Sequence, residues 1–208
     1  MTARAVVTGG SGGIGSAVVD AMRDRGWEVT SLSRREGCDV SDEAQVHGAF
    51  ARFEALDALV HCAQVLIKRP VAEMSASDWD GQLGAGLRGA FLCSREAFRL
   101  MRGRGGSIVL VSSLSGVAGA EKFGGMSAYV AAKSGLAGLT EVLAVEGRPE
   151  RIRVNAISPG AVDTPMLRIA GVQGPRLQPA EVARLIVWLA SPDSDPISGA
   201  NLRLDPHQ

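Results

Sequence analysis

Thr8-Gly9-Gly10-Ser11-Gly12-Gly13-Ile14-Gly15 follows a short apolar run, Ala5 to Val7, and precedes an amphipathic run, Ala17 to Met22. This order predicts a strand, a glycine-rich turn and a helix. Glycines leave the backbone N–H groups of the turn open to a phosphate, and the helix begins with unpaired donors and the positive end of its dipole. The stretch therefore suits a dinucleotide pyrophosphate. G-x-G-x-x-G alone is a weak signal, but its place at the first strand–helix junction strengthens it, and no Lys-Ser/Thr follows to indicate a P-loop.

The composition indicates a globular protein rather than a disordered or nucleic-acid-binding one. Of the 208 residues, 46% are apolar, and the formal net charge is zero. A neutral chain lacks the strongly basic surface of nucleic-acid binders. No linker divides the sequence, so we expect one dinucleotide-binding domain over residues 1–208.

Cysteine usage and hydropathy indicate a cytoplasmic protein. Cys38, Cys62 and Cys93 are odd in number and widely spaced, as expected for reduced thiols. The three histidines lack metal-ligand spacing, so no metal is predicted. The first strand begins almost at Met1, which leaves no room for a secretion signal, and no apolar run approaches the ~20 residues of a membrane helix.

The second predicted strand, Glu28 to Ser33, ends where a dinucleotide-binding fold places the adenosine ribose. An acidic residue there accepts hydrogen bonds from a free 2′-hydroxyl, whereas Ser33-Arg34-Arg35 better suits a 2′-phosphate. The sequence therefore favours NADP(H) over NAD(H). The simpler alternative is two solvated arginines on a turn, one of them neutralised by Glu36.

The segment after this strand is too short for a complete third strand. Only two residues separate Arg35 from Cys38-Asp39-Val40-Ser41, and Ser41-Asp42-Glu43-Ala44 then predicts a capped helix that runs to about Phe53. A parallel crossover needs about a dozen or more residues. We therefore expect the third strand and its preceding helix to be shortened or missing, which leaves the second strand at or near an edge.

Strands alternate with helices along the rest of the chain and predict an α/β, doubly wound parallel sheet of Rossmann type. The helix from Ser77-Asp78-Trp79 to Met101 carries four glycines, each costing ~1 kcal/mol against alanine. They indicate close backbone packing or a bend, and simple tolerance of weak positions is the alternative. Residues 161–178 contain two prolines and two glycines and predict a short substrate lid. The remaining strands are expected at 56–62, 107–112, 153–158 and 200–205, and the remaining helices at 128–145 and 179–190.

Tyr129 and Lys133 are four residues apart on a predicted helix, so the phenol and the ammonium share one face. A phenol has a pKa near 10 and needs a nearby cation to act as an acid or base at neutral pH. Lys133 is such a cation. The pair alone is a frequent accident on amphipathic helices, but it occurs here beside the glycine-rich turn and a strand that ends in Val111-Ser112-Ser113.

Taken together, these motifs resemble the short-chain dehydrogenase/reductase family over nearly the whole chain. The motifs occur in the family's order: Thr8-Gly9-x-x-x-Gly13-Ile14-Gly15, Asp39-Val40, Ala63, Ser112-Ser113, Tyr129-x-x-x-Lys133, and Asn155-Ala156-Ile157-Ser158-Pro159-Gly160 followed by Val162 and Thr164.

The resemblance implies a catalytic role for three residues. Ser113 would hydrogen-bond the substrate carbonyl, Tyr129 would exchange a proton with that oxygen, and Lys133 would hold the nicotinamide ribose and lower the tyrosine pKa. The Tyr-x-x-x-Lys spacing points away from the family's enoyl reductases. The residues expected to bind the coenzyme are Gly9, Ser11, Gly12, Gly13, Ile14, Gly15, Ser33, Arg34, Arg35, Asp39, Val40, Ala63, Tyr129, Lys133, Pro159, Gly160, Val162 and Thr164.

The sequence departs from the family pattern at three places. His61-Cys62-Ala63-Gln64 replaces Asn-Asn-Ala-Gly, so Gln64 stands where a glycine lets the backbone lie close to the coenzyme. Gly86 stands where relatives carry a helix asparagine that anchors a water linking the lysine to solvent. The loop between Ser113 and Tyr129 is longer, with Glu121-Lys122-Phe123 inserted.

The sequence thus predicts an NADPH-dependent reductase of a carbonyl on a small, hydrophobic substrate, the last inferred from Met166, Leu167 and Ile169. The alternative is a catalytically impaired or non-redox cofactor-binding or regulatory protein on the same fold, given Gly86 and Gln64. The resemblance further implies a homodimer or homotetramer formed through the two long helices, with no nucleic-acid or membrane partner.

Overall fold

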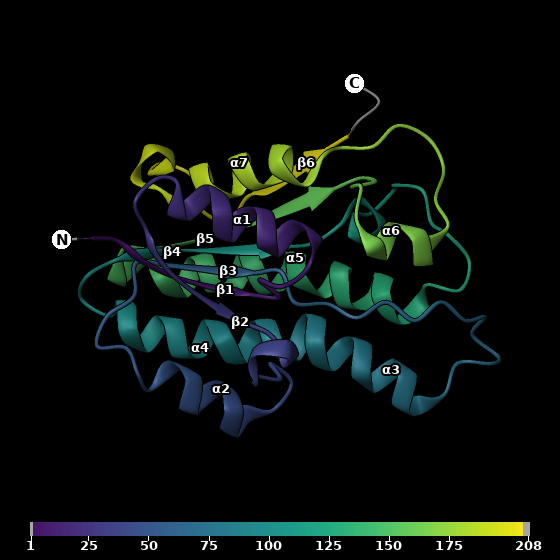
Figure 1. Ribbon diagram of the computed structural model, residues 1–208, viewed down its shortest axis with the longest axis horizontal. Coiled ribbons are helices and arrows are strands. Elements are labelled where there is room, and N and C mark those ends of the chain that lie inside the picture. The colour runs from purple at the N-terminus through teal and green to yellow at the C-terminus, as the bar shows by residue number, and fades with distance from the viewer. Residues whose placement is uncertain (1, 206–208) are drawn as a thin grey trace.

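The computed structural model describes residues 2–205 and contains a six-stranded, entirely parallel sheet in the order β2-β1-β3-β4-β5-β6 (Figure 1). This confirms the predicted α/β fold. The buried strands are short apolar runs that are covered on both faces, as a parallel sheet requires. The strands are β1 (Arg4–Thr8), β2 (Glu28–Leu32), β3 (Ala58–His61), β4 (Gly106–Val111), β5 (Ile152–Pro159) and β6 (Asn201–Leu204).

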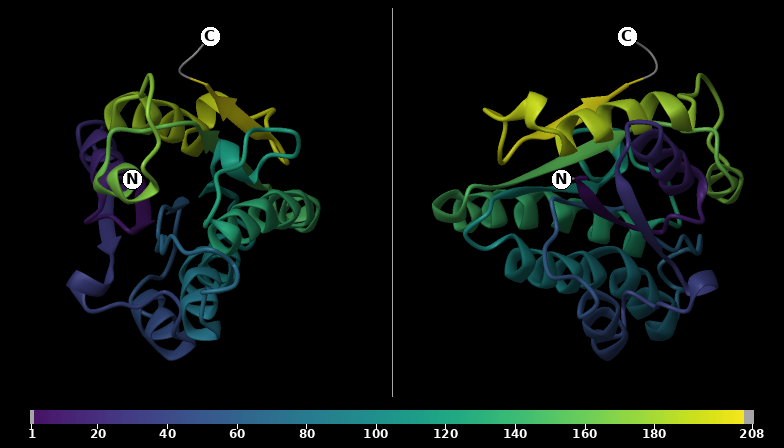
Figure 2. Two further views of the ribbon diagram at one scale, coloured as in Figure 1. Left: turned by 90° about the vertical axis from the view of Figure 1, so that its right-hand side faces the viewer. Right: turned by 60° about the vertical axis from the view of Figure 1, so that its left-hand side comes forward.

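Helices cover both faces of the sheet (Figure 2). One face packs against α1 (Gly13–Arg23) and α7 (Pro179–Ala190), and the other against α4 (Gly89–Met101) and α5 (Ser127–Gly147). Alternate residues of one strand serve the two cores: in β1, Val6 belongs to the α4–α5 side, while its neighbours belong to the α1–α7 side. The shorter helices are α2 (Glu43–Phe50), α3 (Ala76–Leu83) and α6 (Pro165–Ala170).

Within residues 2–205 the sheet has no strand beyond β2, as the spacing of the sequence predicts. Strand β1 pairs with β2 on one side and β3 on the other, which makes β2 an edge. A single 3₁₀ turn at Arg34–Glu36 follows β2, and α2 begins at Glu43 with its cap at Asp42, whose carboxylate accepts from two backbone N–H groups. Helix α2 ends at Phe50, a little earlier than expected.

The glycine-rich long helix has a defined bend. Its cap is Ser75 rather than Ser77, and α3 ends at a π-helical turn, Gly84–Arg88, from which α4 continues. Side chains at Gly86 and Gly89 would have a Cβ 1.9 Å from Gln64 Oε1 and 2.8 Å from Val40 Cγ2. Gly86 and Gly89 therefore serve close packing against neighbouring segments, whereas a Cβ at Gly81 would meet nothing within 4 Å, so this glycine is merely tolerated.

Helix α5 and the turn after it form the stretch Ser127–Glu150, which by length and composition only is apolar enough to cross a membrane, with a mean hydropathy of 1.2. The sequence expectation that no apolar run approaches this length is therefore wrong for this helix. Core helices of soluble proteins pass the same test, and α5 packs on β5 and bears Tyr129 and Lys133.

Candidate active site

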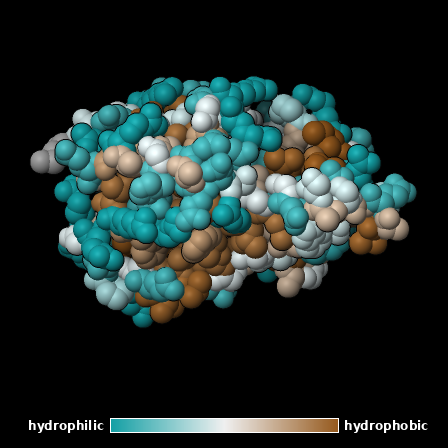
Figure 3. All heavy atoms as spheres, turned by 90° about the horizontal axis from the view of Figure 1, so that it is seen from below, coloured by the Kyte–Doolittle hydropathy of each residue, from teal (hydrophilic) through white to brown (hydrophobic). Residues whose placement is uncertain are grey.

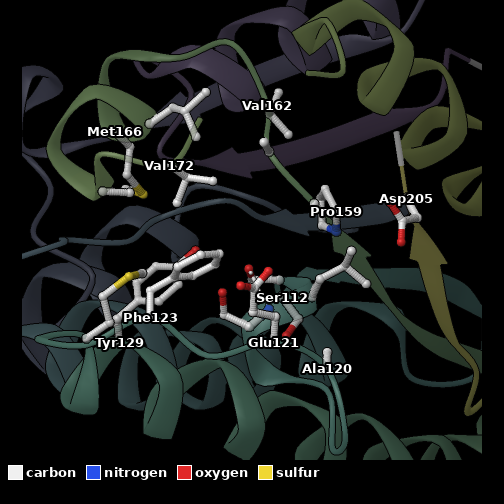
Figure 4. A pocket seen from close by; sticks show the side chains of 18 of the residues that line it. Ser112, Ala120, Glu121, Phe123, Tyr129, Pro159, Val162, Met166, Val172 and Asp205 are labelled. Carbon is white, nitrogen blue, oxygen red and sulfur yellow. Dashed lines mark hydrogen bonds between the residues drawn. The ribbon is translucent and has the colours of Figure 1, made fainter. Parts of the chain in front are cut away.

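The three predicted catalytic residues come from two adjoining elements at the carboxyl end of the sheet. Ser113 is the second residue after β4, and Tyr129 and Lys133 lie on one face of the first turns of α5. Ser113 and Tyr129 line a cavity of about 850 Å³, which Figure 4 shows from close by. This is the edge at which open α/β sheets bind ligands.

Lys133 is held against the end of β4. Its side chain is 3% exposed, and Nζ donates a hydrogen bond to Val111 O at 2.6 Å. The ammonium lies 5.7 Å from the centre of the Tyr129 ring. Burial lowers the pKa of Lys133 to about 8, because it disfavours the charged form. The charge of this lysine is therefore sensitive to any group that accepts from its remaining N–H bonds.

Tyr129 is the only tyrosine of the chain and is buried. Burial raises the pKa of its phenol above the usual value, and a hydrogen bond from Ser113 opposes that rise. The resemblance implies a lowered pKa through Lys133, but here the ammonium is bonded to a backbone carbonyl. The polypeptide therefore holds Tyr129 in the protonated form, which suits a proton donor.

The glycine-rich turn is packed so closely that side chains would fill it. A Cβ at Gly9 would lie 2.8 Å from Ala63 N, and one at Gly13 would lie 2.5 Å from Thr164 Cγ2. Gly9 also has a φ of +67°, which disfavours other residues. Three predicted coenzyme-binding segments thus converge beside the open N-terminus of α1, where a pyrophosphate fits.

The adenosine end of the predicted coenzyme site lies on the exposed turn after β2. Arg34 and Arg35 are exposed and have no acidic partner among residues 2–205. The Glu36 carboxylate accepts hydrogen bonds from Ser31 Oγ at 2.8 Å and Ser33 Oγ at 2.5 Å. Glu36 therefore does not neutralise an arginine, contrary to the simpler alternative drawn from the sequence. Its carboxylate instead places a negative charge at the end of β2.

The other predicted coenzyme residues fall into two groups. Those that line the 850 Å³ cavity are Ile14, Tyr129, Pro159, Gly160, Val162 and Thr164. Outside its lining, Asp39 accepts from the backbone and hydroxyl of Ser41, and Val40 is buried against Gly89. The first group shares one cavity and the second follows the edge strand, and the coenzyme-binding roles of both stay predictions.

His61 takes part in a buried hydrogen-bond chain that sequence reasoning missed. Its Nε2 lies 3.2 Å from Ala85 O, an acceptor, so Nε2 carries the proton and Nδ1 accepts from Thr8 Oγ1 at 2.9 Å. Ala63 N donates in turn to Thr8 Oγ1. Burial and the positive charge of Lys133 lower the pKa of His61 to about 3. The chain ties the glycine-rich turn, the end of β3 and the π turn together.

The cavity is apolar around Tyr129 and polar at its far side. Met166 and Val172 point from the α6 segment toward Phe123 and Tyr129 (Figure 4). Sequence reasoning placed Glu121 and Phe123 in an insertion but did not identify the polar lining residues near the C-terminus, Arg203 and Asp205. Residues at the end of β6 reach the site because β6 pairs with β5 in the sheet. The order of strands in a sheet has no signal in the local sequence. Within the described chain no group of three His, Cys, Asp or Glu residues could hold a metal.

The α6 segment is tied to the body of the protein. Lys68 Nζ donates to Ala170 O at 2.7 Å, at the C-terminal end of α6, where a cation is favoured. Val162 also pairs with Leu177 in an isolated parallel bridge. Residues 161–178 thus form an anchored segment that contains α6, and their role as a substrate lid stays a prediction.

Comparison with known sequences identifies the family. A family model described as enoyl-(acyl carrier protein) reductase matches residues 9–206. The trans-4-hydroxycyclohexanecarboxylate dehydrogenase of Sinomonas cyclohexanicum is 37% identical over 80% of this chain and 67% of its own length. The acetoacetyl-CoA reductase of Rhizobium meliloti is 34% identical over 97% of this chain and 96% of its own.

A solved structure shows the same fold over nearly the whole chain. Ligand-free aldohexose dehydrogenase of Thermoplasma acidophilum superposes with a TM-score of 0.89 at 28% identity, covering 99% of this chain and 93% of that one. The chain belongs to the short-chain dehydrogenase/reductase family of nicotinamide-dependent oxidoreductases.

Proposed function

We propose that the protein is an NADP(H)-dependent reductase of a ketone carbonyl on a small, hydrophobic substrate. The observation that carries this proposal is that Ser113 and Tyr129 line the cavity and that Lys133 Nζ lies 5.7 Å from the centre of the Tyr129 ring. The glycine-rich turn beside them is packed too closely to accept a side chain at Gly9 or Gly13. Relatives named as dehydrogenases of hydroxyl compounds and as an acetoacetyl-CoA reductase support carbonyl chemistry. The spacing of Tyr129 and Lys133 supports it over enoyl reduction.

The roles of the side chains follow from their protonation states. The coenzyme, when bound, supplies the hydride. The Ser113 hydroxyl donates a hydrogen bond to the carbonyl oxygen, and Tyr129, protonated at neutral pH, gives that oxygen a proton. Lys133 is charged below a pH of about 8 and stabilises the phenolate left behind.

Coenzyme selection is proposed to rest on the turn after β2. The guanidinium of Arg34 is exposed there and free to pair with a 2′-phosphate, which favours NADP(H). Glu36 opposes this preference, because its carboxylate lies at the same strand end, on Ser31 and Ser33.

The hydrophobic character of the substrate is inferred from the apolar wall around Tyr129, which Leu66, Met126 and Ala170 share. The enzyme is expected to act in the cytoplasm.

A homodimer or homotetramer is proposed through the long helices, where Phe91, Val142 and Val145 are 46%, 48% and 63% exposed. Figure 3 shows hydrophobic side chains on the helical face below the sheet. Light scattering that gives a monomer mass would contradict this assembly.

The test is a calorimetric titration with NADPH, NADP, NADH and NAD, followed by a carbonyl panel with the coenzyme that binds. We expect Tyr129→Phe to bind NADPH like the wild type and to lose at least about 100-fold in turnover. Turnover by Tyr129→Phe equal to that of the wild type would remove the catalytic assignment. Failure of all four coenzymes to bind would favour the non-redox alternative.

A further inference from the structure

The loop before α5 brings a carboxylate into the cavity. It contains the inserted segment Glu121-Lys122-Phe123, which forms neither helix nor turn. Glu121 and Phe123 line the cavity, whereas Lys122 between them does not. This is the alternation of side chains that an extended backbone produces. In the view of Figure 4, Glu121 lies between Phe123 and Asp205. The insertion thus adds an acidic and an aromatic side chain to the cavity wall.

Lys122 holds this segment in place through the backbone. Its Nζ donates hydrogen bonds to Val117 O at 2.6 Å and to Ala120 O at 2.9 Å, so the ammonium closes the loop on itself. At the other end of the segment, Gly125 O accepts a hydrogen bond from Arg69 N at 2.9 Å. The segment is therefore held on both sides, and its lysine bonds backbone carbonyls rather than the neighbouring carboxylate.

The end of β6 brings a second charged side chain to the cavity. Leu202 and Leu204 pack on the core on the α1–α7 side, so the residue between them points to the other face of the sheet. There Arg203 lines the cavity together with Asp205. Within residues 2–205 neither Arg203 nor Glu121 forms an ion pair. The cavity thus carries two charges of opposite sign that are not paired with each other.

These two charges differ in their place relative to the proposed catalytic residues. Phe123, two residues after Glu121, packs in the cluster that contains Tyr129. Arg203 lies on the edge strand β6, which β5 separates from β4, the strand that precedes Ser113. A ligand that contacts Ser113 and Tyr129 is therefore placed to meet the carboxylate of the inserted segment before the guanidinium at the edge of the sheet.

The rest of the cavity wall near Tyr129 is apolar. It includes Leu66, Met166 and Val172. Ligand pockets commonly combine such a lining with a few polar groups that fix the orientation of the ligand. A ligand with its carbonyl at Tyr129 and its body on this apolar wall has one charged group within the same part of the cavity, the Glu121 carboxylate. A carboxylate accepts its strongest hydrogen bonds from cationic donors.

We propose that Glu121 is a specificity-determining residue that selects carbonyl substrates bearing an ammonium group. Its carboxylate accepts a charge-assisted hydrogen bond from that group while the carbonyl oxygen lies at Ser113 and Tyr129. The substrate is then a hydrophobic ketone with one cationic end. This inference rests on the proposed function, because the proposed catalytic residues set the place of the carbonyl.

The test compares three ketones with one skeleton, cyclohexanones that carry a methyl, an aminomethyl or a carboxylate group at carbon 4. At neutral pH the second is a cation and the third an anion. We expect the wild type to show a kcat/KM about five- to tenfold higher for the ammonium ketone than for the methyl ketone, through a lower KM. A preference for the carboxylate ketone would assign the selection to Arg203 and overturn the proposal.

Glu121→Gln removes the charge and keeps the shape. It should abolish the preference for the ammonium ketone and leave the KM of the methyl ketone and of the coenzyme unchanged, because neither depends on this carboxylate. Glu54→Gln is the matched control: its carboxylate is exposed and outside the cavity lining, so the variant changes the net charge equally and should keep the preference. A preference that persists in Glu121→Gln would overturn the proposal.

A binding measurement separates this inference from the proposed function. The probe is 4-(aminomethyl)cyclohexanol, the alcohol that reduction of the ammonium ketone gives, and calorimetric titration with it needs no turnover. We expect its dissociation constant to be about five- to tenfold higher for Glu121→Gln than for the wild type. Equal constants would overturn the proposal even if every ketone is reduced. A wild type that reduces no carbonyl but shows this difference in binding would count against the proposed function alone.

Discussion

At one end of the proposed coenzyme site, Tyr129 and Lys133 are buried on a 21-residue helix, and Lys133 is bonded to the backbone of a central strand. At the other end, Arg34, Arg35 and Glu36 form one exposed turn beside the edge strand β2. All three side chains are exposed, and within residues 2–205 no strand pairs with the outer side of β2. The catalytic end is therefore positioned by the core, and the adenosine end by its own short turn.

This difference in burial gives the two ends different roles. Burial fixes the geometry and the protonation of a group, which catalysis requires. Exposed charges contribute little each and are screened by salt, so they select between similar coenzymes without holding the fold. Substitutions should accordingly have large effects at the catalytic end and small ones at the adenosine end.

The largest effect is expected for Lys133→Met. Methionine fills similar space without the ammonium, so turnover should fall about 10²–10⁴-fold because the phenolate of Tyr129 loses its cation. The free energy of unfolding should not fall, since the buried charge is costly to desolvate. Steady-state kinetics and denaturant unfolding measure both. Turnover within tenfold of the wild type would show that the catalytic end does not depend on this lysine.

The next effect is on acid stability and concerns His61. Its pKa is lowered from 6.5 to about 3 in the folded protein, so between these values the unfolded chain binds the extra proton. Stability from the neutral histidine is thus present above about pH 6.5 and is lost as the pH falls toward 3. His61→Asn should flatten the decline of unfolding free energy over this range. Parallel curves for the two proteins would contradict the buried, neutral assignment.

A smaller effect, on stability, is expected for Gly116→Ala in the loop after β4. A Cβ there would lie 2.6 Å from the backbone of Lys133, so the substitution should cost about 1–3 kcal/mol by overpacking. Gly124→Ala in the same loop is the matched control, because its Cβ would meet nothing within 4 Å. Thermal or denaturant melts compare the two. Equal stability would mean that the catalytic end is less tightly packed than described.

The fold was largely predictable because it depends on local signals and on chain length. Helix α7 begins and ends at the residues expected, Pro179 and Ala190, and the missing strand follows from too few residues between Arg35 and Glu43. The N-cap of α3 was predicted at Ser77 but is Ser75. Both serines are suitable capping residues, so the local sequence does not distinguish between them.

Site residues that belong to one sequence motif could be predicted from the sequence. Contacts between residues that are distant in the sequence could not. Tyr129, Lys133 and Ser113 lie together as the motifs imply. The packing of Gln64 against Gly86 joins positions 22 residues apart on different elements, and no pattern within either segment indicates it. The hydrogen bonds from Ser31 and Ser33 to Glu36 depend on the tight turn at Arg34–Glu36, whose geometry the sequence did not reveal.

The smallest effects are expected at the adenosine end, from Arg34→Ala and Glu36→Gln. Removing the exposed cation should weaken NADPH binding about five- to tenfold and leave NADH unchanged, because one exposed charge contact with a phosphate contributes about 1 kcal/mol. Removing the Glu36 charge should strengthen NADPH binding by a smaller factor, since its carboxylate faces the same strand end. Both differences should shrink when calorimetric titrations are repeated at high salt, where such charges are screened. If instead Arg34→Ala weakened both coenzymes equally, the arginine would hold the turn rather than select the phosphate, and the adenosine end would resemble the catalytic end in being structural.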